Sequence, residues 1–171
     1  DESKKIIFKN IKGENLKDIK KYDFVFSLGV IHHIPNYKKA CKKIYNSLKT
    51  NGKFICWVYG YEGNEILIRL LNILRLFTTS LPYKLVALIG KLFAFLLYGI
   101  LKFYPTKSEY WSRAKKMSRY VLEQIIIDQL IPKIANYYKE DELVEIYEHL
   151  NYKKIQINHC NKNSWSLLIS K

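Results

Sequence analysis

The chain has 171 residues, a formal net charge of +14 and a hydrophobic content of 49%. This length is enough for one domain with its own core. The charge favours an anionic partner, either nucleic acid or a membrane surface. Its lysines are scattered along the chain, however, and no nucleic-acid recognition motif accompanies them. We therefore expect no specific nucleic-acid partner.

The three cysteines, Cys41, Cys56 and Cys160, are odd in number and widely separated. Neither a disulfide framework nor a CxxC metal site fits this spacing, so we expect no bound metal and a reducing compartment. The opening DESKKIIFKN has no signal-peptide pattern. Together these features predict a cytoplasmic protein.

The first predicted strand covers residues 23–30. Its residues are apolar with almost no polar interruption, which is typical of a central parallel strand covered by helices on both faces. The strand leads into a Ser-Leu-Gly turn and then to two adjacent histidines, His32 and His33. Open α/β sheets place their chemistry at this end of a strand.

A helix and a second strand follow. Asn36 is suited to capping a helix, and Gly52 is suited to ending it. The apolar residues between them recur at three-and-four spacing. The second strand is predicted at residues 54–59, followed by the polar loop GYEGN.

Residues 66–104 predict two or three very apolar helices, and residues 85–101 are the extreme case with Lys91 as their one charge. A helical cap over an active site would bury this segment. An interfacial helix with basic flanks would lie against lipid headgroups, where a lipid-linked substrate would suit it. A transmembrane helix needs about 20 residues, and Lys91 would cost about 2.5 to 3.5 kcal/mol in the membrane.

The last part of the chain alternates again. A helix from about Glu140 places Leu143 and Tyr147 on one face. Alternating residues then predict half-buried strands at residues 154–158 and 165–169, joined by a turn at residues 160–163.

Residues 22–64 and 128–171 resemble a class I S-adenosylmethionine-dependent methyltransferase of the small-molecule type. The features that carry this resemblance are the strand ending in SLGVIHHIP, the short helix, the LKTNG turn and the strand FICWVY. The resemblance implies an α/β fold, namely the C-terminal half of a Rossmann-like methyltransferase sheet. It also implies that the last strand is antiparallel and that a helical cap is inserted.

The family begins with a strand and a glycine-rich GxGxG turn that wraps the cofactor, and the seven glycines of this chain are scattered singly. We therefore expect the N-terminal half of the same enzyme to be a missing partner, whose absence exposes a sheet edge. The expected domains are a partial core at residues 1–64, a helical insert at 65–127, and a C-terminal helix with the final strand pair at 128–171. Within the first, residues 4–9 are expected to be a remnant of the third strand.

The resemblance implies S-adenosylmethionine as the cofactor. The loop Gly13, Glu14 and Asn15 resembles the family's loop near the adenine. Either Glu14 takes the role of an acidic residue that the family places near Lys12, or the alignment is displaced, and an ordinary solvated turn is the alternative. The other cofactor-binding residues implied by the resemblance are Ser27, Leu28 and Gly29.

The segment after the fifth strand borders the substrate pocket in the family. The implied substrate-binding residues are Tyr59, Tyr61, Glu62, Asn64 and Tyr137, and the expected acceptor is a small molecule or is glycan-like. For Tyr137 the alternative is a packing role, which tyrosines at such spacing often have. Asp128 and Gln129 also match family positions close to the pocket.

Methyl transfer from a sulfonium is a displacement that depends mainly on alignment, and a general base adds perhaps 10² to 10⁴ in rate for a protonated acceptor. His32 and His33 are the catalytic candidates, with Glu62 as a hypothetical orienting partner. In a period-two strand tail, one histidine would face the pocket and the other the helix layer. Alternatively, both hold the turn through backbone hydrogen bonds.

A second class of function also fits. In it, the chain is a non-catalytic, basic, membrane-associated binding module that residues 85–101 anchor to lipid. Peripheral membrane contact is therefore an open alternative to a purely cytoplasmic location.

Overall fold

A computed structural model describes residues 6–103, 105, 109–150 and 152–171. Its sheet has four strands in the order β1-β2-β4-β3, with β1 and β2 parallel and the other pairs antiparallel. This confirms the predicted α/β fold with an antiparallel last strand. The strands are β1 Tyr22–Leu28, β2 Leu48–Tyr59, β3 Lys154–Cys160 and β4 Ser164–Ser170.

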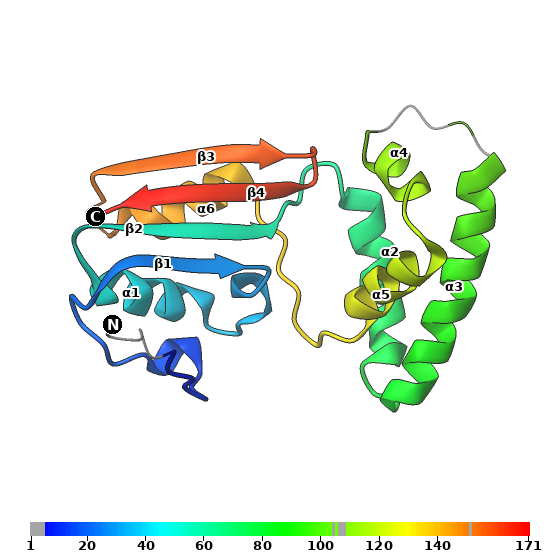
Figure 1. Cartoon of the computed structure of the whole chain (residues 1–171), viewed down its shortest axis with the longest axis horizontal. Coiled ribbons are helices and arrows are strands. Elements are labelled where there is room, and N and C mark those ends of the chain that lie inside the picture. The colour runs from blue at the N-terminus through cyan, green and yellow to red at the C-terminus, as the bar shows by residue number, and fades with distance from the viewer. Residues whose placement is uncertain (1–5, 104, 106–108, 151) are drawn as a thin grey trace, which may run out of the picture. The chain divides into compact units, whose positions relative to one another are not determined.

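The helices fall into two compact units (Figure 1). The first unit, Asp1–Val58, Glu140–Asn158 and Ser166–Lys171, holds most of the sheet, the 3-10 turns η1 (Gly13–Asn15) and η2 (Ile31–His33), and the helices α1 (Tyr37–Ser47) and α6 (Glu140–Glu148). The second unit, Tyr59–Lys139 and His159–Trp165, holds α2 (Glu65–Thr78), α3 (Tyr83–Phe103), α4 (Glu109–Lys115) and α5 (Arg119–Leu130).

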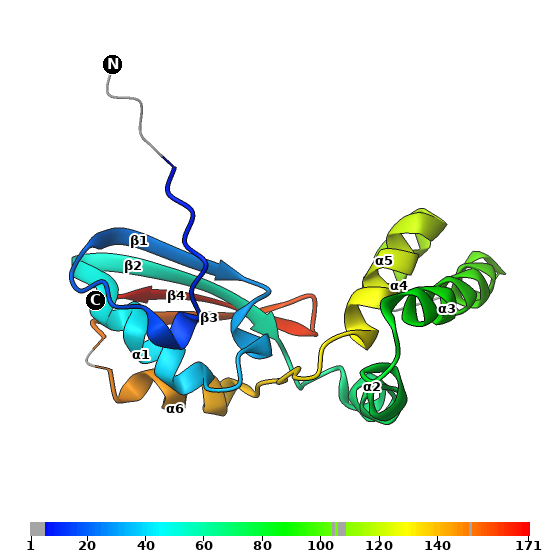
Figure 2. The ribbon, with the colours of Figure 1, turned by 90° about the horizontal axis from the view of Figure 1, so that it is seen from below.

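In the first unit, α1 and α6 lie on the same side of the sheet (Figure 2). Their apolar faces bury Ala40, Ile44 and Tyr147 together with Phe54 and Leu167 from the strands. Burial of this kind stabilises the unit by roughly 1.5 to 3 kcal/mol for each large side chain.

The other face of β1 is exposed. Phe24, Phe26 and Leu28 alternate along this face, and Phe26 is 68% exposed. β1 is also an edge strand of the sheet. Within the first unit, one face and one edge of β1 meet no other described element. The prediction of a central strand covered on both faces is therefore wrong for the part of the chain that the structure describes.

The junction between α1 and β2 confirms the predicted helix cap and corrects the predicted helix end. The Asn36 side chain accepts a hydrogen bond of 3.2 Å from the Lys39 backbone N–H, as a helix cap does. The helix ends at Ser47 rather than at Gly52, and β2 begins at once. Asn51 has a φ of 64°, and a Cβ on Gly52 would lie 2.9 Å from the Lys49 carbonyl oxygen. Gly52 thus permits an irregularity inside β2, at the point where the pairing of β2 with β1 shifts register.

The predicted strand remnant at residues 4–9 is wrong where it can be judged. Residues 4 and 5 lie outside the described part of the chain, and residues 6–9 belong to no strand. They follow an exposed path, with Ile6, Ile7 and Phe8 exposed. Apolar residues alone did not specify a strand here, because pairing with a neighbouring strand is what stabilises one.

The C-terminal elements agree with the prediction. α6 begins at Glu140 and buries Leu143 and Tyr147. The hairpin β3–β4 turns through Asn161 and Lys162, both with positive φ, and the Asn163 N–H donates to the Cys160 carbonyl at 3.1 Å. These are the properties of a two-residue type I′ turn.

In the second unit, α3 packs against α5 along one stripe. The buried residues of this stripe include Val86, Gly90 and Ala94. A Cβ on Gly90 would collide with the Ile127 side chain, so the glycine permits the close approach of the two helices. Two apolar clusters, one around Ala94, Leu101, Ala114 and Leu122 and another around Leu71, Val86 and Leu130, hold the four helices together.

Candidate active site

The first unit places the two histidines directly after the end of β1. Gly29, with a φ of 74°, turns the chain, and its N–H donates to the Trp57 carbonyl at 3.1 Å. The chain then forms η2, in which the His33 N–H donates to the Val30 carbonyl at 2.9 Å. The period-two tail expected for the histidines is wrong, because consecutive residues of a 3-10 turn do not point to opposite faces.

The two histidines differ in how deeply their side chains are buried. The His32 side chain is fully buried, and its ring lies edge-on at 4.3 Å from the His33 ring and 6.2 Å from the Trp57 ring, measured between centroids. Burial, together with the charge of His33, lowers the pKa of His32 to about 3. His32 is therefore neutral near pH 7 and has a pKa far from that of an efficient general base. His33 is only half-buried and is the more accessible of the pair.

Two of the predicted cofactor segments lie in the first unit. Gly13, Glu14 and Asn15 form η1, and a Cβ on Gly13 would lie 3.3 Å from the Ile34 side chain. Thus η1 contacts the residue that follows η2. Ser27 and Gly29 are half-buried at the end of β1, and Leu28 is exposed there.

The second unit brings together two predicted substrate residues, Tyr59 and Tyr137. Their rings stack with centroids 5.5 Å apart and planes 20° apart. Gln129 Nε2 donates to the Tyr59 hydroxyl at 2.7 Å, and the Tyr137 hydroxyl donates to Gln129 Oε1 at 3.3 Å. Burial, and next the nearby Asp128 carboxylate, raise the pKa of Tyr59, so this hydroxyl stays protonated near neutral pH.

Arg75 joins this group from α2, and sequence reasoning missed it. Its side chain is 7% exposed. Its Nη2 donates to the Tyr137 hydroxyl at 3.1 Å, and its Nε donates to the Gln129 backbone carbonyl at 2.9 Å. No local sequence pattern predicts these two hydrogen bonds, because the partner residues are 54 and 62 positions away in the chain.

The same arginine completes the end of a helix. Gln129 and Leu130 are the last residues of α5, where carbonyl oxygens have no partner within the helix. Arg75 donates to the first of these carbonyls, and the Thr78 hydroxyl donates to the second at 2.8 Å. A positive charge at a helix C-terminus is also favourable. Arg75 therefore fixes α5, and through Gln129 and Tyr137 it fixes the stacked tyrosines.

The loop after β2 holds the remaining predicted substrate residues. Asn64 Nδ2 donates to the carbonyls of Gly60 at 2.8 Å and Asn163 at 2.7 Å, so this amide fastens the loop to the β3–β4 turn. The Tyr61 ring lies 5.3 Å from Lys139 Nζ, which is a cation–π distance. Glu62 is half-buried in the same loop. Whether these residues contact a substrate, and whether Glu62 orients a histidine, remain predictions.

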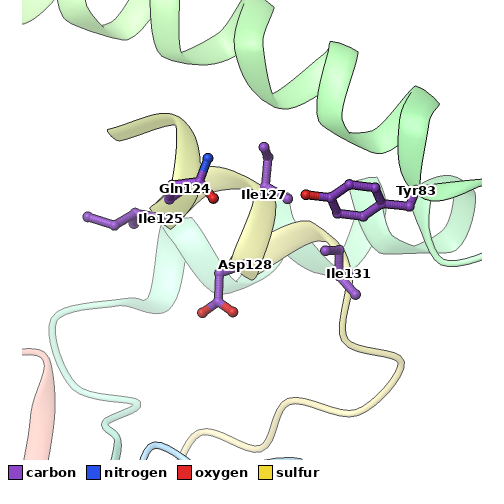
Figure 3. A pocket seen from close by; sticks show the side chains of 6 residues that line it. All are labelled: Tyr83, Gln124, Ile125, Ile127, Asp128 and Ile131. Carbon is purple, nitrogen blue, oxygen red and sulfur yellow. The ribbon is translucent and has the colours of Figure 1, made fainter. Parts of the chain in front are cut away.

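A pocket of about 410 Å³ lies in the second unit, between the start of α3 and α5 (Figure 3). Three isoleucines supply its apolar wall, and Gln124, Asp128 and the Tyr83 hydroxyl supply polar atoms. Asp128, which the resemblance places close to the substrate pocket, lines it, whereas the predicted catalytic, cofactor-binding and substrate-binding residues do not. Asp128 connects this pocket with the tyrosine pair. Its side chain lines the pocket, and, in addition to burial, its charge raises the pKa of Tyr59.

Comparison with protein families gives a match in the first part of the chain. Residues 3–56 match the model of a methyltransferase domain. This range contains η1, β1, η2, α1 and most of β2. The resemblance to S-adenosylmethionine-dependent methyltransferases is thereby confirmed for this part of the chain. Among curated proteins, no relative matches the chain.

Comparison with solved structures gives matches over almost the whole chain. A possible exported protein from Bordetella parapertussis aligns with a TM-score of 0.52 and 9% identity, covering 94% of this chain and 42% of its own. A methyltransferase from Methanosarcina mazei aligns with a TM-score of 0.49 and 11% identity, covering 96% and 66%. A possible histamine N-methyltransferase from Thermotoga maritima gives a TM-score of 0.47 and 12% identity, covering 93% and 61%. At such low identity these likenesses concern the fold alone, and the chain spans less than two thirds of the length of these three proteins.

Proposed function

We propose, because residues 3–56 match the model of a methyltransferase domain, that this chain is the C-terminal part of an S-adenosylmethionine-dependent methyltransferase. Its acceptor in this proposal is a small or glycan-like molecule. The observation that carries the proposal is the turn after β1, where a positive-φ glycine and η2 present His33 at the carboxyl end of a parallel strand.

The two histidines take different roles in this proposal. His32 is a buried, neutral side chain that packs beside Trp57 and holds the turn. His33 is the residue that accepts a proton from the acceptor hydroxyl or amine as the methyl group is transferred. A base of this kind contributes about 10² to 10⁴ in rate.

The residues at the end of β1 suit one side of a cofactor site. Gly29 has no side chain, and a Cβ there would meet only the Trp57 ring, at 3.9 Å, so the backbone can be approached closely. The backbone of Ser27, Leu28 and Gly29 and the Glu14 carboxylate would hold the cofactor from this side. S-adenosylmethionine supplies an electrophilic methyl group when it is bound. The role of this chain is then to orient the acceptor and to remove its proton.

The second unit, taken by itself, offers a tyrosine pair that suits an acceptor of this class. Tyr59 and Tyr137 offer an aromatic face and two hydroxyl groups, and Gln129 and Arg75 hold them in place. Stacking on such a face and hydrogen bonding to its hydroxyls are suited to sugars and to flat small molecules.

The remaining part of the enzyme, in this proposal, covers β1. The strand has an unpaired edge and an exposed face carrying Phe24, Phe26 and Leu28. The Bordetella parapertussis structure, of which the alignment covers 42%, supports the idea that further elements accompany this sheet. An N-terminal half of the same enzyme would pair with the edge and supply the glycine-rich turn.

Calorimetry of S-adenosylmethionine binding tests this division. We would compare the 171-residue chain with a form extended at its N-terminus by the preceding residues of the natural polypeptide. We expect the extended form to bind the cofactor and the shorter form to bind far more weakly. If neither form binds, the chain is not part of a methyltransferase of this type.

Turnover of the extended form tests the histidine. We expect His33→Ala to lower kcat by about 10² to 10⁴ while the dissociation constant of the cofactor stays the same. His149→Ala is the matched control, because His149 is exposed after α6. Unchanged turnover in the His33 variant would reject its role as a base and leave it as a residue of the turn.

A further inference from the structure

Helix α3 has a second apolar side that meets no other described element of the second unit. Its 21 residues contain a window with a mean hydropathy of 2.0, and 22% of this window is buried. The buried stripe with Val86, Gly90 and Ala94 faces α5. At about 100° per residue, the opposite side carries Leu88, Leu92, Phe95 and their neighbours. These three side chains are 63%, 58% and 60% exposed.

The lysines of α3 lie along one edge of this exposed side. Lys84, Lys91 and Lys102 are seven and then eleven residues apart, so on a helix they fall within about 20° of a single line. All three are exposed, and α3 contains no acidic residue. The result is an apolar stripe bordered by a row of positive charges.

We propose that this stripe is a docking surface for an anionic lipid bilayer. In this arrangement α3 lies in the plane of the interface, with Leu88, Leu92 and Phe95 among the acyl chains. The long apolar stems of the lysines follow the helix surface, and their ammonium groups reach the anionic headgroups. This inference concerns a surface of the second unit and stands whether or not the chain takes part in methylation.

Two observations favour a bilayer surface over the alternatives. A transmembrane position would expose the stripe that now packs against α5, and would separate Gly90 from Ile127. A second copy of the chain would bring two lysine-bordered stripes together, and like charges at such distances are unfavourable. A bilayer with anionic headgroups meets both the apolar stripe and the row of charges.

Flotation with lipid vesicles tests the proposal. The 171-residue chain would be mixed with vesicles of phosphatidylcholine containing 30% phosphatidylserine, or with pure phosphatidylcholine vesicles. We expect binding to the first and much weaker binding to the second, and we expect added salt to weaken the first, because each basic residue near an anionic surface is worth about fivefold in affinity. Equal binding to both vesicles, or none to either, would overturn the proposal.

Charge-matched variants locate the surface. Replacing Lys84, Lys91 and Lys102 by glutamine should weaken binding to the anionic vesicles by roughly 100-fold. The control replaces Lys39, Lys42 and Lys154, which are also exposed but lie in the first unit. It removes the same total charge and should have a clearly smaller effect. Equal losses would mean that only the net charge matters, and the assigned surface would be wrong.

Substitution in the stripe provides an independent test. Phe95→Glu should reduce vesicle binding about tenfold or more, because a buried aromatic side chain is lost from the interface. Phe26→Glu is the control, since Phe26 is a phenylalanine on β1 that is 68% exposed, compared with 60% for Phe95. Sedimentation of the chain without lipid would be run in parallel. If Phe95→Glu abolishes self-association but not vesicle binding, the stripe is a contact between two copies and the proposal fails.

Discussion

The two units use apolar residues in opposite ways. In the first, Phe54 is 0% exposed between the sheet and its helices, whereas Lys38, Lys39 and Lys42 of α1 are exposed. In the second, α3 is apolar on nearly every side, and Phe95 is 60% exposed. The alternation of a strand or of an amphipathic helix tells which side is covered. In a helix such as α3 that is apolar on nearly every side, the sequence does not indicate which side packs against the rest of the protein.

The largest expected effect comes from the same substitution made in both units. Phe54→Ala removes a fully buried ring that packs 6.5 Å from the Tyr147 ring, and we expect the free energy of unfolding to fall by about 3 to 5 kcal/mol. Phe95→Ala removes an exposed ring and should change it by less than about 0.5 kcal/mol. Urea denaturation of both variants measures the difference. A similar loss in both would show that Phe95 is buried in solution and would end the contrast between the units.

The next effect is a pH dependence that belongs to the first unit. Folded His32 has a pKa lowered to about 3, whereas in the unfolded chain it returns to its ordinary value of 6.5. The unfolded chain therefore binds a proton first as the pH falls. The stabilisation is fully present above about pH 6.5 and is lost progressively between pH 6.5 and pH 3.

We expect His32→Leu to flatten this part of the curve of unfolding free energy against pH. His159→Leu, which changes an exposed histidine of the second unit, is the control for the loss of an imidazole side chain. Denaturation at a series of pH values from 3 to 8 would compare the variants. If both slopes equal that of the unaltered chain, His32 is not buried as described.

The smallest effect distinguishes the two sides of α3. Gly90→Ala should destabilise the second unit by about 1 to 3 kcal/mol, since the new methyl group collides with Ile127. Gly99→Ala meets nothing within 4 Å and should stabilise the helix by about 0.5 to 1 kcal/mol. Thermal unfolding followed by circular dichroism would give both values. The same sign for the two variants would contradict the packing of α3 against α5.

Much of the first unit is readable from sequence because its signals are local. The Asn36 cap, the start of α6 at Glu140 and the final hairpin each depend on residues a few positions apart. Gly52 was misassigned because a glycine suits both a helix end and an irregular strand. The interpretation of η2 as a strand tail was wrong, because the hydrogen bonds that define the 3-10 turn, from the His33 N–H to the Val30 carbonyl and from the Ile34 N–H to the Ile31 carbonyl, cannot be read from the residue types.

The candidate site contains contacts that could not be predicted from the sequence. Tyr59 and Tyr137 were predicted separately by resemblance, and the structure stacks them. Arg75 looks like an ordinary polar residue of an apolar helix, and its role depends on partners on α5 and beyond. Contacts of this kind are set by tertiary packing, and helix periodicity carries no information about them.

The order of the strands in the sheet affects the order in which the parts of the chain can fold. β2 and β4 are neighbours in space, yet the helices α2 to α6 are all synthesised between them. The contacts among those helices are closer in sequence than the pairing of β2 with β4, and local contacts generally form faster. During translation, α2, α3 and α5 are therefore expected to associate before the sheet is complete. The last six residues, Ser166–Lys171, must leave the ribosome before the first unit can close.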